Sequence, residues 1–378
     1  MGAQDSGSKD SEYFFIRVHG EQELVSYRQL KKQVDEGSFS AENRVWTEET
    51  NKWQSAGEVE QLNDLFNPRR GRVELSGKKL YAVASGKGGV GKSTLTASLA
   101  VGMASLGKEV ILVDADLGGA NLHTIMGIEP RYSLYDFYSP QRDTLDDILQ
   151  PTSMQRLSMI GGASGTLGSA NQKYFQKQRF IRQLRELTAD AIFLDLGSGA
   201  SFDVIDFFLL ADEKIVIVTP GPTSILEGFN FIKVALFRGV FRALKDHPEA
   251  LAVLAKLDIN RPGNVMFLIA KIVNSMSQVD PEAATIFESI LVSYRPKIIL
   301  NMAKHRNDIE KVAGIRTAAK KLLSVNVDYL GNIPFDAKID KAAQAFQPFL
   351  SHNPKSKASR SLLGLIEEKL MATNHVLH

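Results

Sequence analysis

The residues from Gly86 to Ser93, GKGGVGKS, constrain the fold of this chain more than any other stretch. They match the pattern G-x-x-x-x-G-K-[ST], with an apolar run, LYAVAS, before them and a run with helical spacing after them. A strand, a glycine-rich turn and a helix in this order form a loop whose backbone N–H groups surround phosphates. The sequence therefore predicts a nucleotide-binding domain, with a helix from Lys92 to about Leu106 whose amino terminus faces the phosphates.

The motif assigns roles to the residues of this loop. We expect Lys92 to contact the β- and γ-phosphates and the Ser93 hydroxyl to bind Mg²⁺. One residue is left unexplained by the spacing, because such a loop needs only the lysine at its end and this loop has a second, Lys87. The predicted phosphate-binding residues are Gly86, Lys87, Gly88, Gly89, Val90, Gly91, Lys92, Ser93 and Thr94.

From Leu80 onward, short apolar runs alternate with longer helical stretches. The runs are LYAVAS, EVILVD, RLSMIGG, AIFLDL, KIVIVTP, PKIILN and VDYLGNIP. Continuous apolar strands separated by helices are typical of a parallel sheet that is covered on both faces. We therefore predict an α/β fold, a mostly parallel sheet flanked by helices, over residues 80–378, with a helical insertion at about 246–296.

The residues before this region predict a second, smaller unit. Residues 1–12 are polar and indicate a disordered tail, and residues 67–79 indicate a linker because they combine Pro, Gly and basic residues. Between them, residues 13–66 predict a small α+β module. It starts with a β-rich run at Tyr13–Val18 and continues with helical spacing at Tyr27–Asp35.

The composition excludes several classes of protein. The formal net charge of the 378 residues is +2, so the chain as a whole has no strong attraction for nucleic acid or anionic lipid. The chain has no cysteine, which excludes disulfides, thiolate metal sites and cysteine-ligated iron–sulfur clusters. No apolar run has the length of a membrane span. These observations indicate a cytoplasmic protein.

The string KGGVGKST resembles the deviant Walker A motif of the MinD/ParA/FlhG ATPases, which belong to the SIMIBI class of P-loop NTPases. The FlhG/MinD branch is the most similar. In that family the first lysine reaches the nucleotide of the partner across an ATP-dependent dimer. The resemblance implies that Lys87 acts in trans and Lys92 in cis as catalytic residues, since an added cation at the developing charge assists phosphoryl transfer.

The resemblance extends to two acidic motifs. VILVDADLGGANLHTIMGI resembles the strand and switch I of the family, which implies that Asp116 orients the attacking water and approaches the Mg²⁺ shell. Asp114 is a weaker, structural candidate. AIFLDLGSGAS ends its apolar run at Asp195, the Walker B position, and Gly197 then begins switch II. The implied metal set is Ser93, Asp116 and Asp195, with both acids acting through water.

Two further sequence motifs indicate which nucleotide base is bound. The nearest match to the [NT]-K-x-D signature of GTPases is AKLD at 255–258, which lacks the first polar residue. The family instead uses a strand-ending Asn and a later G-x-(I/V)-P-x-D, which PKIILN and LGNIPFD supply here. The resemblance therefore implies ATP with Mg²⁺, and Asn301, Pro334 and Asp336 as nucleotide contacts.

Residues 13–66 resemble a GYF-2-type domain, a small protein-interaction module. SYRQLKKQVDEGSFS and RVWTEETNKWQSAGEVEQL carry this resemblance. The GYF relatives bind proline-rich peptides on aromatic surfaces. The resemblance implies a protein partner, with a proline-rich segment as one ligand and Tyr27, Trp46 and Trp53 as contacts. Burial of both tryptophans in the core is the alternative.

The family resemblance implies a dimerising switch that slowly hydrolyses ATP and controls the position or number of a cell-envelope machine, such as a flagellum, a pilus or a division apparatus. Two alternatives are a ParA-like DNA-segregation ATPase and a nucleotide-binding scaffold without turnover. DNA contact is less favoured, because the basic residues of FIKVALFRGVFRALK indicate one solvated helix side.

The C-terminal tail can be interpreted as a helix that packs on the protein or as a helix that contacts a membrane. It places Leu362, Leu363, Ile366 and Leu370 on one helix face, but its polar face lacks the basic residues of a membrane-surface helix. We therefore expect the last packing helix of the ATPase domain. A polar or membrane-peripheral location is the alternative to a purely cytoplasmic one.

Overall fold

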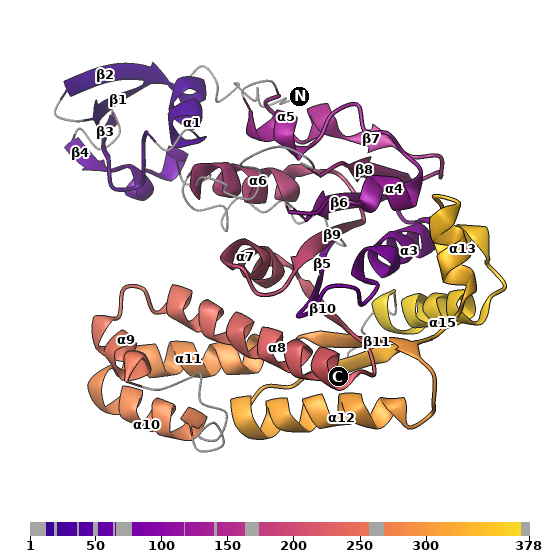
Figure 1. Cartoon of the computed structure of the whole chain (residues 1–378). Coiled ribbons are helices and arrows are strands. Elements are labelled where there is room, and N and C mark those ends of the chain that lie inside the picture. Colours follow the sequence, from indigo (N-terminus) through magenta and orange to yellow (C-terminus); the bar gives the residue numbers. More distant parts are fainter. Residues whose placement is uncertain are drawn as a thin grey trace, which may run out of the picture. The chain divides into compact units, whose positions relative to one another are not determined.

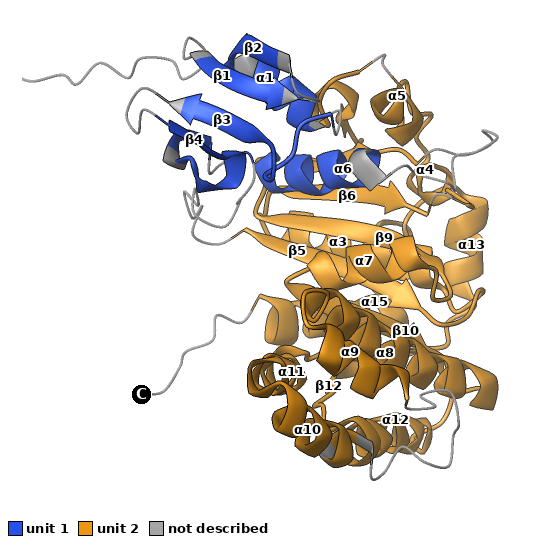
Figure 2. Cartoon of the chain, turned by 90° about the vertical axis from the view of Figure 1, so that its left-hand side faces the viewer, with its two compact units in different colours: residues 1–77, 171–187 blue, residues 78–170, 188–378 orange. Residues whose placement is uncertain are grey.

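A computed structural model describes residues 13–18, 21–35, 38–47, 52–62, 65, 78–116, 118–139, 142–162, 174–256 and 268–371. The predicted tail at 1–12 and residues 67–77 of the predicted linker lie outside the described residues. The chain forms two compact units (Figure 2): residues 1–77 with 171–187, and residues 78–170 with 188–378. Residues 171–187 therefore group with unit 1, although in sequence they lie inside the 80–378 region.

Unit 1 contains a four-stranded antiparallel sheet in the order β2-β1-β3-β4. Its elements are β1 (Tyr13–Val18), β2 (Glu21–Ser26), α1 (Tyr27–Asp35), β3 (Arg44–Thr47), β4 (Lys52–Ser55), 3₁₀ turns at Ala56–Glu58 and Glu60–Leu62, and α6 (Tyr174–Glu186). The predicted β-rich run and the predicted helix have the same bounds as β1 and α1. Within this unit α1 contacts α6.

The strands of unit 1 alternate between a buried and an exposed face, as the period of two residues requires. In β1, Phe14 and Ile16 are buried while Phe15 and Arg17 are exposed. The buried face packs with α1 into a core that includes Leu30.

Unit 2 is built on an eight-stranded sheet in the order β12-β11-β10-β5-β9-β6-β8-β7. The strands are β5 (Lys79–Ser85), β6 (Val110–Ala115), β7 (Gln150–Pro151), β8 (Leu157–Ile160), β9 (Ala191–Ser198), β10 (Glu213–Val218), β11 (Lys297–Ala303) and β12 (Asp328–Pro334). All neighbours are parallel except the short edge strand β7. Each of the predicted apolar runs forms one of these strands, so the predicted fold class is confirmed.

Helices cover both faces of this sheet (Figure 1). The helices of unit 2 are α3 (Lys92–Ser105), α4 (Leu122–Met126), α5 (Leu134–Tyr138), α7 (Phe202–Leu210), α8 (Pro222–Ala243), α9 (Pro248–Ala255), α10 (Leu268–Val279), α11 (Pro281–Ser293), α12 (Asp308–Ala318), α13 (Lys338–Gln344), α14 (Phe349–His352) and α15 (Lys357–Leu365). A 3₁₀ turn at Asp146–Ile148 and π-helical turns at Ala319–Leu323 and Ile366–Leu370 complete the unit.

The two helical layers have different partners. On one face, α3 contacts β5, β6, β8 and β9, and it also contacts α4, α14 and α15. On the other face α7 and α8 contact the middle of the sheet, and α12 contacts β11 and β12. Helix α11 contacts α8, and α10 contacts both α9 and α11; these three helices occupy the stretch for which we expect a helical insertion.

The C-terminal helix packs into the core of unit 2. Leu362 and Ile366 are fully buried and Leu370 is 5% exposed, all within a cluster that contains residues of α3. The apolar side of this helix is therefore covered by protein, and its residues after Met371 lie outside the described part. Among the described residues, no helix combines the length and the apolar character that crossing a bilayer requires.

The order of the strands determines where the predicted site residues meet. β5 has β9 on one side and β10 on the other, and β6 follows β9. Because these strands are parallel, their carboxyl ends share one edge of the sheet, where open α/β sheets bind their ligands. The loop after β5, the acids Asp114 and Asp116 at the end of β6, and Asp195 in the carboxyl-terminal half of β9 all lie toward this edge.

Candidate functional site

The glycines of the loop between β5 and α3 are required by backbone conformation and by packing. Gly89 and Gly91 have φ of 77° and 81°, in the left-handed region that favours glycine. A Cβ on Gly91 would also collide with the side-chain nitrogen of Asn301, and a Cβ on Gly86 would collide with the backbone carbonyl of Glu227. The loop is thus pressed against the ends of α8 and β11.

Lys92 forms a buried ion pair. Its Nζ lies 2.8 Å from Asp195 Oδ1, and the two side chains are 7% and 1% exposed. Asp195 Oδ1 also accepts a hydrogen bond from Thr96 Oγ1 at 3.1 Å, and Lys92 Nζ lies 3.4 Å from Ser93 Oγ. The P-loop lysine, the metal-binding hydroxyl and the Walker B acid that the sequence predicts are therefore in one cluster.

Asp114 lies beside this pair. It is the register partner of Asp195 on the neighbouring strand and is fully buried. Burial first, and then the charge of Asp195, raise the pKa of Asp114 to about 7. Its carboxylate accepts backbone hydrogen bonds from Leu122 at 3.0 Å and Asp116 at 3.3 Å. Asp114 thus holds the chain that follows β6, as expected for a structural residue.

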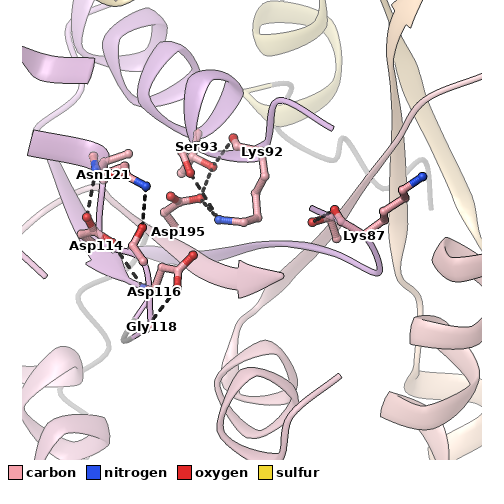
Figure 3. Close-up of polar contacts among 12 residues, drawn as sticks. Lys87, Lys92, Ser93, Asp114, Asp116, Gly118, Asn121 and Asp195 are labelled. Atoms are coloured by element: carbon pink, nitrogen blue, oxygen red, sulfur yellow. Dashed lines mark hydrogen bonds and ion pairs between the residues drawn. The ribbon is translucent and has the colours of Figure 1, made fainter. Parts of the chain in front are cut away.

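Asp116 lies at the rim of the same edge. It is half-buried, and its Oδ1 accepts the backbone N–H of Gly118 at 3.3 Å. A Cβ placed on Gly197 would lie 3.3 Å from the same oxygen, so the carboxylate faces the start of the predicted switch II. In Figure 3, Asp114, Asp116 and Asp195 lie together on the side of Lys92.

The oxygens of this cluster are suited to magnesium. Ser93, Asp116 and Asp195 supply hydroxyl and carboxylate oxygens, the ligand types that Mg²⁺ prefers. The carboxylates of Asp114 and Asp195 are buried beside one lysine, so a divalent cation would find partly uncompensated negative charge. Among the described residues, no group of three or more His, Cys, Asp or Glu side chains is arranged to hold a metal ion.

Lys87 has a different environment from Lys92. It is exposed, and in Figure 3 its side chain extends away from Lys92 and Asp195. Its backbone carbonyl accepts a hydrogen bond from Ser85 Oγ at 3.0 Å, which holds the main chain. Among the described residues, no hydrogen bond or ion pair involves its ammonium group. The loop is fixed while the charge of Lys87 remains available to another molecule.

Asn301, predicted to contact the base, is engaged with the loop. It is 4% exposed, its Nδ2 donates to Val90 O at 2.8 Å, and its Oδ1 accepts Met302 N–H at 2.9 Å. It thus joins the end of β11 to the phosphate loop. Contact with a base stays a prediction.

Pro334 and Asp336 lie at the end of the next strand, β12. Asp336 Oδ1 accepts the backbone N–H of Lys338 at 3.0 Å, and this hydrogen bond is the largest cause that lowers its pKa. Phe335 N–H donates to Ala303 O at 2.8 Å, so this loop is fixed against β11. The structure brings the predicted base contacts to adjacent strand ends.

Two residues of the site were absent from the sequence prediction. Thr96 donates to Asp195, and it lies one helical turn after Lys92, on the same face of α3. That spacing was a usable signal. The backbone of Glu227 closes on Gly86 from α8, and no local pattern indicates a contact between residues so far apart in sequence.

The basic side chains of α8 are accessible to solvent, as we expect, but two of them also form ion pairs. Arg238 Nε lies 3.1 Å and Arg242 Nη1 3.2 Å from Oδ1 of Asp206, which is 4% exposed. A buried carboxylate needs such partners, because an unpaired charge in the interior is costly. Both arginines therefore hold α8 to α7.

The predicted peptide contacts in unit 1 do not share one surface. Tyr27 is 6% exposed and belongs to the core, so its ring is not available beside the tryptophans. Trp46 and Trp53 are half-buried and face each other across β3 and β4 on the other side of the sheet. Neither belongs to the core, which sets aside the alternative that both are core residues.

Comparison with known proteins gives the following similarities. Residues 76–225 match the model of the ParA family, described as the NUBPL iron-transfer P-loop NTPase. The chain is 26% identical over 283 residues to the antiactivator FleN of Pseudomonas aeruginosa, covering 74% of this chain and 82% of FleN. It is 33% identical over 159 residues to the septum site-determining protein MinD of Helicobacter pylori, covering 41% of this chain and 58% of that MinD.

A solved structure has the same fold. The septum site-determining protein MinD of Pyrococcus horikoshii, in complex with Mg-ADP, superposes with a TM-score of 0.53 and 20% sequence identity. The superposition covers 78% of this chain and 98% of that protein. The mostly parallel sheet flanked by helices is therefore the fold that this MinD also has.

Proposed function

We propose that this chain, a P-loop NTPase of the MinD/ParA family, is an ATP- and Mg²⁺-dependent switch that dimerises, slowly hydrolyses ATP and controls the position or number of a cell-envelope machine. FleN is named as an antiactivator and MinD as a septum site-determining protein, and these names support control of position or number. The N-terminal module recruits a protein partner to this switch.

The difference between the two lysines is the observation that carries this proposal. Lys92 is buried and paired with Asp195, so one phosphate loop already has its own cation. Lys87 is exposed and extends away from that pair (Figure 3). A cation in this position can stabilise transition-state charge on a nucleotide held by a second copy, in the manner of an arginine finger supplied in trans. Dimerisation would then depend on ATP.

The positions of Asp116 and Asp195 support the hydrolysis of ATP. Asp116 lies at the rim, where a carboxylate can orient a water molecule toward the γ-phosphate, while Asp195 remains buried beside Lys92. Bound Mg²⁺ neutralises phosphate charge. Loss of the γ-phosphate would remove contacts at Asp116 and Gly197, which is how nucleotide hydrolysis releases switch segments in related enzymes.

The test is the molar mass in solution, measured by light scattering with Mg²⁺ and either ADP or ATP. We expect a monomer with ADP, a dimer with ATP, and a monomer for Lys87→Ala with ATP, while that variant still binds nucleotide. Lys108→Ala is the matched control, because Lys108 is also exposed but follows the opposite end of α3. A mass that never changes with nucleotide, or a Lys87→Ala variant that dimerises normally, overturns the proposal.

Asp116→Ala tests hydrolysis separately. We expect it to retain ATP-dependent dimers and to lose phosphate release by at least about tenfold, which corresponds to about 1.4 kcal/mol of transition-state stabilisation. Unchanged phosphate release would remove Asp116 from the mechanism without affecting the dimer.

Two other functions are less well supported. The description of the matching family model refers to iron transfer, but the chain has no cysteine to supply thiolate ligands. DNA segregation would require a basic surface, and two of the arginines on α8 are engaged with Asp206. Salt-sensitive DNA binding in the presence of ATP would favour that alternative.

A further inference from the structure

The outer face of the sheet in unit 1 carries a row of apolar side chains that crosses all of its strands. The strand register places Leu24 opposite Phe15, Phe15 opposite Trp46, and Trp46 opposite Trp53. Side chains directly opposite on antiparallel strands lie about 5 Å apart at Cβ. The four residues therefore form one continuous line on a single face.

This row is exposed rather than buried. Leu24 is 52% and Phe15 43% exposed, while the tryptophans are half-buried against their neighbours. The rings of Phe15 and Trp46 meet edge to face with centroids 5.9 Å apart, so they support each other without being covered. Contiguous exposed apolar side chains on one face mark an interaction surface, unlike scattered ones.

A second row on the same face is basic. Arg17 lies opposite Arg44, and both are exposed. The guanidinium of Arg17 stacks over the ring of Trp53, with its carbon 4.7 Å from the ring centroid, so the charge borders the apolar row. Like charges directly opposite each other destabilise a sheet, and a stabilising acid is expected nearby.

The described residues of this face supply no such acid. The other residues of this face whose side chains the structure describes are Gln22, Ser26 and Ser55. Glu58 accepts the backbone N–H of Ser55 at 3.3 Å and forms no ion pair with either arginine. The pair of arginines is therefore uncompensated within the described part of the unit, and an acidic partner would neutralise it.

We propose that this face docks an acidic peptide segment, whose apolar side chains lie on the row of Leu24, Phe15, Trp46 and Trp53 and whose carboxylates pair with Arg17 and Arg44. This inference deepens the proposed function, since it rests on the module recruiting a protein partner. Exposed rings give contact area, and the arginines select against basic sequences. Tyr27, on the core side, makes no contact with the peptide.

The chain contains its own reporter for this surface. Both of its tryptophans, Trp46 and Trp53, lie in the row, so the whole intrinsic tryptophan emission comes from the proposed site. The experiment titrates the full chain in ADP with three synthetic peptides that share leucine and proline positions and carry glutamate, glutamine or lysine between them. We expect saturable changes in emission, with affinity at least about tenfold lower for the lysine peptide and falling as salt increases.

Three variants make the test specific. Phe15→Ser should weaken binding of the glutamate peptide about tenfold, a typical loss for an apolar contact residue. Arg17→Glu combined with Arg44→Glu should reverse the preference toward the lysine peptide. Lys31→Glu, a single charge reversal at an exposed position on α1, should leave the affinities for all three peptides unchanged. Far-UV circular dichroism checks that each variant folds.

Several outcomes overturn the proposal. They are no saturable change with the glutamate peptide, equal affinity for the lysine peptide, or an unchanged preference in the double arginine variant. A change in emission with protein concentration alone, accompanied by a doubled mass in ADP, would make a second copy the occupant and would also overturn it. Because the titration uses ADP, its failure is separate from a failure of ATP-dependent dimerisation.

Discussion

The nucleotide edge of unit 2 and the outer sheet face of unit 1 present their polar and aromatic groups in opposite ways. At the edge, Lys92 and Asp195 are almost fully buried and bonded to each other. On the sheet face, Phe15 and Arg17 are exposed, and Arg17 is supported mainly by the ring of Trp53. Buried charges interact strongly because water is excluded, whereas an exposed apolar row keeps contact area for another molecule.

Because of this contrast, substitutions at the nucleotide edge should lower the free energy of unfolding more than substitutions on the outer sheet face. At the edge, removal of a charge leaves its partner buried and unpaired. On the sheet face, removal of a ring exposes a little more of its neighbours. The predictions below test that difference, from the largest expected change in the free energy of unfolding to the smallest.

Lys92→Met should have the largest effect. It leaves the carboxylate of Asp195 buried with only the Thr96 hydroxyl as a side-chain partner, and breaking such a pair costs about 3–5 kcal/mol. The measurement is the free energy of unfolding in urea, without nucleotide, for the variant and the parent chain. Lys87→Met is the control, since an exposed lysine should change the free energy by less than about 0.5 kcal/mol. Equal losses in the two variants would contradict the distinction between the lysines.

Asp114 should make stability depend on pH. Its pKa is raised from 3.8 to about 7, so its contribution to stability is fully present below pH 3.8 and is lost as the pH rises through 7. A pKa shift of this size changes the free energy of unfolding by about 4 kcal/mol at most. Asp114→Asn removes this ionisation, so the variant should gain stability relative to the parent chain as the pH rises from 4 to 8.

The measurement is urea unfolding at several pH values in EDTA. Asp340→Asn is the control, because Asp340 is exposed and its replacement should leave the difference from the parent chain constant with pH. If Asp114→Asn behaves like that control, Asp114 does not titrate in the interior of the folded protein.

Phe14 and Phe15 compare the two faces of one strand. Phe14→Ala removes a ring that is 5% exposed and should destabilise unit 1 by about 3 kcal/mol. Phe15→Ala removes a ring that is 43% exposed and should cost less than about 1 kcal/mol. Tryptophan emission follows this unit specifically, because both tryptophans lie in it. Similar costs would mean that the outer face is covered in solution.

Arg17→Gln should have the smallest effect on stability. It removes the stacking of a cation on Trp53, which is worth about 0.5–1 kcal/mol at an exposed site. It also relieves the like-charge pair with Arg44, which offsets part of that loss. Arg44→Gln separates the two effects, because it relieves the repulsion and keeps the stacking. A loss well above 1 kcal/mol for Arg17→Gln would mean that Arg17 has a further partner.

Most of the fold of unit 2 could be predicted, because its signals are local. An apolar run such as AIFLDL reads as a buried strand wherever it occurs, and each such run does form a strand of the sheet. The glycine-rich loop likewise predicted the start of α3 at Lys92. The grouping of α6 with unit 1 was not predictable in this way, since it depends on contacts with residues far away in sequence.

The residues of the site also fall into those with a local sequence signal and those that depend on distant contacts. The motif identified Lys92, Ser93 and Asp195, and the structure brings them together. The role of Thr96, the contact of Asn301 with Val90 O and the pairing of Arg238 with Asp206 all depend on which strands and helices are neighbours. The sequence indicated helix faces and strand ends but not which of them meet.

By itself the sequence determined the phosphate loop, the strands that alternate with helices, the absence of thiolate chemistry and the presence of a second lysine at Lys87. These features depend on residue type and short spacing, which the chain encodes directly. Only the tertiary structure decided that Lys92 is paired and Lys87 free to extend, and that Tyr27 is core while Phe15, Trp46 and Trp53 form one exposed row. Burial and strand register depend on contacts between distant segments, and those contacts exist only once the chain has folded.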